Sequence, residues 1–73
     1  MLNYSIPEGF VLADFIAACL SSGLRLEKED GQPNPVGAVT RAGLALEVRL
    51  DDPSQANQDI VDAAVQAQGG SRA

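Results

Sequence analysis

The segment Leu44–Leu50 alternates strictly between large aliphatic residues and residues that are small or charged. Its aliphatic positions are Leu44, Leu46, Val48 and Leu50. Because successive side chains of a strand point to opposite faces of a sheet, this alternation predicts a strand with one buried and one wet face. A sheet with one wet face is typically antiparallel, and its other face must be covered by further elements of the chain.

A helical pattern precedes this strand near the N-terminus. Apolar side chains there recur every three or four residues, and Gly23 is a natural end for the helix. Ser5 and Glu8 have the spacing of a capping box, and Pro7 suits the first helical turn. We therefore predict a helix over residues 7–22.

A second helix is predicted after Asp52, which suits the N-cap position, and it ends at Gly69. One apolar stripe on it consists of Ala56, Ile60, Ala63, Ala64 and Ala67. Val61 and Val65 form another stripe, rotated well around the helix. The combined arc is wider than a surface helix needs. Either the whole helix is well buried, or one edge packs on the sheet and the Val61–Val65 edge contacts a partner.

The middle of the chain is less regular. Leu24–Lys28 alternates apolar and charged residues and predicts a strand, and Glu29–Pro35 is rich in turn residues. Val36–Arg41 is either a middle strand or part of a short helix over residues 35–43. Its β-branched Val-Thr pair and its glycines favour the strand.

Together these elements predict an α+β fold, in which both helices cover one face of a small antiparallel sheet of two to three strands. Residues 1–5 either add a further N-terminal strand or fray. The length of 73 residues allows one compact domain, assigned to residues 1–68. The C-terminal tail, residues 69–73, is expected to be disordered.

Charge and composition restrict the possible functions. Ten acids outweigh five bases, which gives a net charge of −5. Because direct nucleic-acid binding needs clustered Lys and Arg, this charge argues against it and favours a protein partner with a basic surface. The sequence has no histidine, and its only cysteine, Cys19, falls on the apolar face of the first helix. We therefore expect neither enzymatic activity nor a cofactor.

Two acidic clusters stand out as candidate contact residues. One lies at the end of the predicted strand Leu24–Lys28, and the other lies on the second helix. Their spacing matches no calcium loop, so we predict no metal site. We expect the acidic clusters to steer a basic partner and an apolar patch to hold it. The candidate partner-binding residues are therefore Glu27, Glu29, Asp30, Asp59, Asp62, Val61 and Val65.

A small acidic inhibitor or adaptor fits these observations best. Compact acidic inhibitors encoded by phages and mobile elements have this general profile of size and charge. We expect such a protein to act in the cytoplasm, where a single cysteine stays reduced. Its target would be a basic site of a larger assembly, for example one that binds nucleic acid. No membrane association is expected, since the apolar run Phe15–Gly23 is too short to span a bilayer.

Two alternatives remain open, and the oligomeric state with them. In the first, the chain is a homo-oligomeric structural subunit, such as a small virion or scaffold component, whose apolar helix edge contacts copies of itself. In the second, Ile16–Cys19 is the cleavage box of an exported lipoprotein. Against that reading, no basic residue precedes the box and Asp14 interrupts the apolar run.

Overall fold

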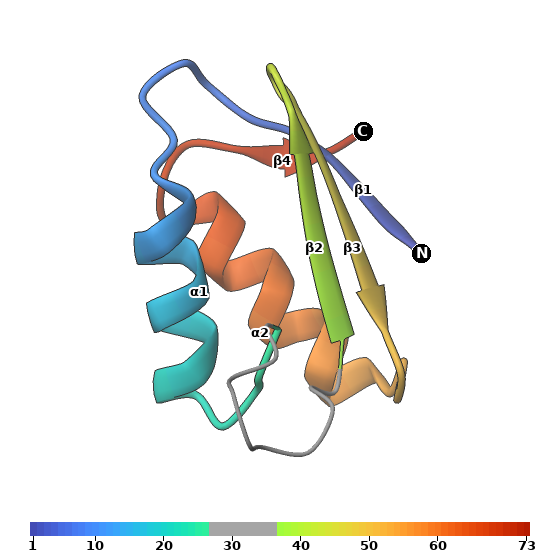
Figure 1. The fold of residues 1–73 in the computed structure, drawn as a ribbon. Coiled ribbons are helices and arrows are strands. Elements are labelled where there is room, and N and C mark those ends of the chain that lie inside the picture. Colours follow the sequence, from blue (N-terminus) through green and yellow to red (C-terminus); the bar gives the residue numbers. More distant parts are fainter. Residues whose placement is uncertain (27–36) are drawn as a thin grey trace.

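The computed structural model of the 73-residue chain describes residues 1–26 and 37–73 (Figure 1). The elements in chain order are β1 (Leu2–Ser5), α1 (Leu12–Ser21), β2 (Gly37–Ala42), β3 (Ala45–Leu50), α2 (Gln55–Gln66) and β4 (Ser71–Arg72). The four strands form one antiparallel sheet in the order β2-β3-β1-β4. This element order is that of the split β-α-β topology. The predicted α+β class and the further N-terminal strand are confirmed, whereas β4 was not predicted as a strand.

The N-terminal strand is central to the sheet. Tyr4 of β1 lies opposite Leu46 of β3 on one side and opposite Arg72 of β4 on the other. The alternation predicted for β3 is confirmed over residues 45–49, since Leu46 and Val48 are buried while Ala45, Glu47 and Arg49 are exposed. One face of the sheet is therefore open. Its exposed residues are Asn3, Ser5, Ala38, Thr40, Ala42, Ala45, Glu47, Arg49 and Ser71. Leu44, which was predicted on the buried face, lies in the turn and is exposed.

Strands β2 and β3 form a tight hairpin that is visible at the top of Figure 1. The pair Ala42–Ala45 closes it, so the turn consists of Gly43 and Leu44. Gly43 has a φ of 59°, which glycine adopts without strain and which suits the first position of a type II′ turn. The strand alternative for this stretch is confirmed over residues 37–41, while Val36 lies outside the described residues.

The hydrophobic core joins the inner face of the sheet to both helices. It is mostly aliphatic, and it also holds all three aromatic residues of the sequence. The rings of Phe10 and Phe15 pack with centroids 5.7 Å apart. The buried apolar residues are Tyr4, Ile6, Phe10, Phe15, Cys19, Leu24, Leu26, Leu46, Val48, Val61, Ala64 and Val65.

The first helix begins later than the sequence predicted. α1 starts at Leu12 rather than residue 7, and its N-cap, Val11, makes no side-chain capping bond. The predicted capping box is wrong because Ser5 is held in β1, opposite Ala45 and Ser71. Pairing in the sheet takes precedence over local capping here. The predicted end is close, since Gly23 follows the helix with a φ of 91°.

The second helix also begins later than predicted. Ser54, and not Asp52, is the N-cap of α2, and its hydroxyl accepts a hydrogen bond from the Asn57 amide at 3.3 Å. The helix ends at Gln66, and Gly69 then reverses the chain with a φ of 86°.

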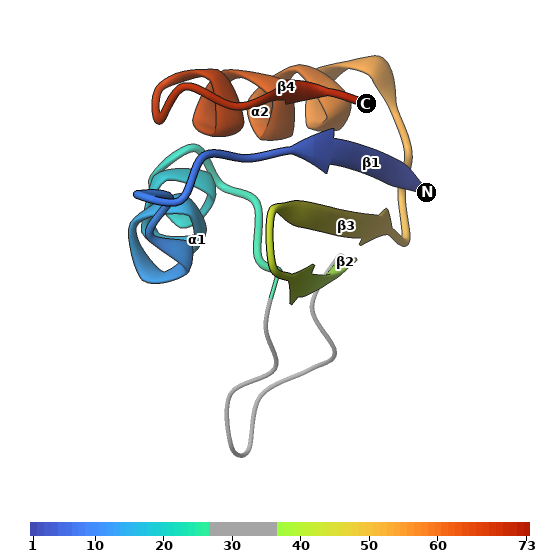
Figure 2. The same ribbon diagram turned by 90° about the horizontal axis from the view of Figure 1, so that it is seen from above.

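The C-terminal tail is ordered, which corrects the expectation for residues 69–73. Ser71 and Arg72 form β4 beside β1, and the amide of Ala73 donates to the carbonyl of Asn3 at 2.9 Å. The tail is ordered because β1 offers it an edge for pairing. Both chain ends consequently lie near one another at one side of the sheet (Figure 2).

The predicted strand Leu24–Lys28 is not formed over its described part. Leu24–Leu26 has no regular structure, although Leu24 and Leu26 are both buried. Glu27 and Lys28 lie outside the described residues. Within residues 1–26 and 37–73, no helix is both long and apolar enough to cross a bilayer.

Candidate functional site

The apolar arc of α2 has a buried and an exposed part. The stripe considered as a partner contact from the sequence is the buried one. Val61 and Val65 are fully buried in the core. They therefore cannot form a surface edge for a partner, and their assignment as contact residues is wrong. The other stripe is the accessible one, since Ala63 and Ala67 are exposed and Ile60 is half-buried.

Helix α2 packs against α1 (Figures 1 and 2). Its exposed stripe lines a groove beside α1. The groove measures about 420 Å³ and is open to solvent. Helix α1 contributes Ala18 and Ser22 to it. Helix α2 contributes Asp59, Ile60, Ala63, Ala64 and Ala67. Apart from Asp59 and Ser22, the lining is apolar, so the groove suits aliphatic side chains.

A glutamine from the end of α2 fixes the start of α1 beside it. The Gln68 amide nitrogen donates to the carbonyl of Val11 at 3.0 Å, and its Oε1 accepts from the Val11 amide at 2.8 Å. The second bond satisfies a backbone donor that an uncapped helix start leaves open. Gln68 thereby links the start of α1 to the residues that follow α2.

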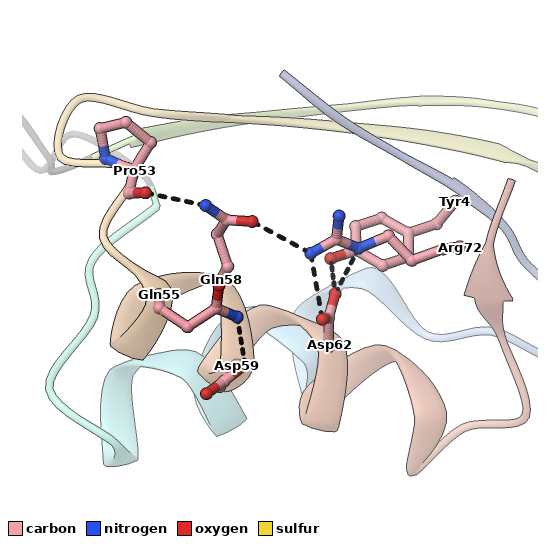
Figure 3. Close-up of polar contacts among 7 residues, drawn as sticks. All are labelled: Tyr4, Pro53, Gln55, Gln58, Asp59, Asp62 and Arg72. Carbon is pink, nitrogen blue, oxygen red and sulfur yellow. Dashed lines mark hydrogen bonds and ion pairs between the residues drawn. The ribbon is translucent and has the colours of Figure 1, made fainter.

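Asp59 is the charged residue of the groove lining. Its Oδ1 accepts a hydrogen bond from Gln55, one turn earlier on α2, at 2.8 Å (Figure 3). The side chain is exposed, as the sequence prediction required. Asp59 therefore adds a negative charge at the border of an apolar surface, where it can attract a cation.

Asp62, the other acid predicted on this helix, has a different environment. Its carboxylate forms an ion pair with Arg72 of β4 and accepts a hydrogen bond from the Tyr4 hydroxyl (Figure 3). The hydrogen bond from Arg72 is the main cause that lowers the pKa of Asp62. Burial is the main cause that raises the pKa of Tyr4. Asp62 is therefore already paired with a cation of the same chain, and its role in partner binding stays a prediction from the sequence.

The remaining predicted contact residues cannot be placed. Glu27, Glu29 and Asp30 lie outside the described residues. Their role in partner binding stays a prediction from the sequence.

Cys19 is fully buried at the centre of the core, as its position on the apolar face predicted. Burial raises the pKa of its thiol to about 11, which disfavours the reactive thiolate. Cleavage before Cys19 would remove β1 and most of α1, so the lipoprotein hypothesis conflicts with this fold. Among the described residues, no three His, Cys, Asp or Glu side chains gather as a metal site would require.

The open face of the sheet carries no exposed aromatic ring, because Tyr4, Phe10 and Phe15 are all buried. Arg41, the basic residue of β2, is directed to the interior. Its guanidinium donates to the carbonyl of Phe10 at 2.7 Å and lies over the ring of that residue.

Sequence reasoning missed Ala18 and Gln68 as parts of the site. The alanine stripe was visible in the sequence, but nothing local indicated that it would face α1. Gln68 bonds Val11 across 57 positions of sequence, and no periodic pattern reports such a contact.

No protein-family model matches this chain, and neither the curated proteins nor the solved structures include a significant match to it. The split β-α-β topology hosts many unrelated functions and does not select one.

Proposed function

We propose that this chain is a non-enzymatic binding protein, acting as an inhibitor or adaptor, that docks onto a basic surface of a larger protein. The observation that carries the proposal is the unequal exposure of the two kinds of charge. Acidic side chains of the described residues face solvent, while most of the basic ones are directed inward or already paired.

The acidic side chains are widely distributed over the surface. Of the seven acidic side chains in the described residues, six are exposed: Glu8, Asp14, Glu47, Asp51, Asp52 and Asp59. Asp51 and Asp52 are adjacent, just before α2, where the helix dipole also favours negative charge.

The basic side chains contribute much less to the surface. Arg41 is bound to the carbonyls of Phe10 and Gly43, and Arg72 is paired with Asp62. Arg25 is half-buried, Arg49 is exposed on the open face of the sheet, and Arg72 is exposed although it is paired. Among the described residues, seven acidic side chains outnumber four arginines, so this part of the chain is negative. Such a surface repels nucleic acid and attracts a basic protein over distances of about 10 Å at moderate salt.

The docking step would use charge and apolar contact in turn. Exposed carboxylates raise the association rate by long-range attraction, and a small apolar surface then limits dissociation. With Val61 and Val65 in the core, the groove between α1 and α2 replaces them as the candidate apolar surface.

The proposal is tested by capturing partners from the native host on immobilised protein and measuring the association rate of the captured partner. Asp51→Lys/Asp52→Lys should slow association about tenfold or more, and about 1 M salt should slow the wild type similarly, since the screening length is then about 3 Å. Asp51→Glu/Asp52→Glu, which keeps the charge, is the matched control and should bind like the wild type. A partner whose association rate responds neither to salt nor to charge reversal would overturn the proposal.

A further inference from the structure

We infer that the groove between α1 and α2 receives the apolar face of a basic amphipathic helix of the partner. This inference rests on the proposed function, because it names the element of the partner that the acidic protein binds. Four features of the described residues support it: shape, lining, rigidity and charge.

The shape and lining of the groove suit a helix. Its walls carry the exposed alanines Ala18, Ala63 and Ala67, and Ala64, which is 7 % exposed, lies deeper. Such short side chains allow a third helix to approach α1 and α2 closely, at the 8–10 Å or so between axes that is typical of packed helices. An amphipathic helix in an apolar groove is a recurring recognition mode. A volume of about 420 Å³ leaves space for aliphatic side chains of such a helix.

The groove is formed before any partner arrives. The side chain of Gln68 forms hydrogen bonds with both the backbone amide and the backbone carbonyl of Val11. Phe15 and Cys19 of α1 are fully buried in the core. Both helices also contribute to one hydrophobic core, so the groove walls are already side by side without a partner. Preorganisation of this kind favours affinity by reducing the ordering that accompanies binding.

Charge distinguishes a basic partner from a second copy of this chain. Asp59 is the charged residue of the groove lining, and Asp14 is exposed one turn before Ala18 on the same side of α1. A Lys or Arg beside the apolar face of an incoming helix would meet these carboxylates. A second copy with a net charge of −5 would instead bring like charges together across the contact.

The probe for the test is an 18-residue helical peptide with leucines on one face and lysines on the other. A second peptide of the same length, with glutamates in place of the lysines, controls for charge. Each is titrated into the full 73-residue protein, with the dissociation constant measured and the backbone amide shifts followed by NMR. Ala63→Trp fills the groove, and Ala13→Trp places the same side chain at an exposed position of α1 outside the groove lining. Circular dichroism establishes that each variant is folded.

We expect the lysine peptide to bind with shifts centred on Ala18, Ala63 and Ala67, and the glutamate peptide not to bind. Ala63→Trp should weaken binding about tenfold or more, as expected for a blocked interface centre. Asp59→Lys should also weaken it and reduce its salt dependence, whereas Ala13→Trp should bind like the wild type.

Other outcomes overturn the inference in distinguishable ways. If shifts map elsewhere and Ala63→Trp has no effect, the groove is not the docking site. The proposed function then still stands if Asp51→Lys/Asp52→Lys slows capture of the native partner, and fails as well if it does not. Equal binding of both peptides refutes the charge argument. Concentration-dependent dimers that Ala63→Trp abolishes would identify the groove as a contact between copies of this chain and also overturn the inference.

Discussion

Arg72 forms an ion pair with Asp62 through two of its guanidinium nitrogen atoms. Its Nε lies 2.7 Å from Oδ1 of Asp62, and a terminal nitrogen donates to Oδ2 at 3.0 Å. The guanidinium also lies over the ring of Tyr4, 5.7 Å from its centroid. Because Tyr4 belongs to β1, Asp62 to α2 and Arg72 to β4, this cluster ties the short C-terminal strand to the rest of the fold. The pair is bidentate, which is the geometry in which an arginine–carboxylate contact is strongest.

The Asp62–Arg72 pair should make stability depend on acid pH. The hydrogen bond from Arg72, assisted by that from Tyr4, lowers the pKa of Asp62 in the folded protein. A carboxylate whose pKa is lower in the folded state stabilises it above the unfolded value of about 3.9, and this contribution is lost as the pH falls through the folded pKa. We expect Asp62→Asn to be less stable at pH 7 and to lose less stability below about pH 4.

Urea unfolding at pH 7 and at several lower pH values measures this effect. Asp14→Asn, at an exposed position that makes no ion pair among the described residues, is the matched control. A parallel acid dependence for wild type and Asp62→Asn would show that the pair does not contribute.

Gly70 should not tolerate a side chain. A Cβ at this position would lie 2.5 Å from Cγ1 of Val65 and 3.0 Å from the carbonyl oxygen of Ser5. Since Val65 is fully buried and Ser5 is fixed in the sheet, neither can move freely. Gly70→Ala should lower the free energy of unfolding by about 1–3 kcal/mol, as overpacking does in other cores.

Gly9→Ala is the control for Gly70→Ala. No atom lies within 4 Å of a Cβ at Gly9, and its φ is not positive. Its stability should remain within about 0.5 kcal/mol of the wild type. Equal effects of the two substitutions in urea unfolding would refute the packing argument.

Val61 and Ala63, two residues apart on α2, should differ strongly in how well they tolerate a carboxylate. Val61→Asp places a charge in the core without a partner, at a cost of several kcal/mol, which is about the total stability of a small domain. Ala63→Asp leaves its charge exposed and should change stability by about 0.5 kcal/mol or less. Circular dichroism spectra and thermal unfolding distinguish the two. If the Val61→Asp protein folds, Val61 is not a core residue, and Val61 and Val65 become candidates for partner binding again.

Cys19 should be protected from reagents and should contribute to alkaline sensitivity. Its buried thiol should react with a disulfide reagent at a rate set by unfolding, and fast labelling of native protein would refute its burial. Because burial raises the pKa of the thiol to about 11, the unfolded chain loses this proton first, near its ordinary value of about 8.5. Stability should therefore fall as the pH rises from about 8.5 to about 11, and less so in Cys19→Ala.

Periodic patterns predicted the parts of the fold whose environment is set along the chain. Alternation located β3 within one residue, because a half-buried strand repeats every two residues whatever it pairs with. The three-to-four-residue recurrence located both helices but not their starts. Ser5 does not cap α1, because it belongs to β1 and pairs with Ala45 in the sheet. Ser54 rather than Asp52 caps α2, because the path of the chain after β3 decides where the helix begins.

The sequence by itself determined the α+β class, the burial of Cys19 and the acidic character of the surface, since each depends on composition or local spacing. Only the tertiary structure decided which stripe of α2 is buried, because the helical period gives the angle between Val61 and Ala63 but not the direction of the core. It likewise decided that the tail forms β4 and that Asp62 is neutralised. These outcomes depend on contacts such as Tyr4 with Asp62, 58 positions apart, and such contacts are determined by how the whole chain packs.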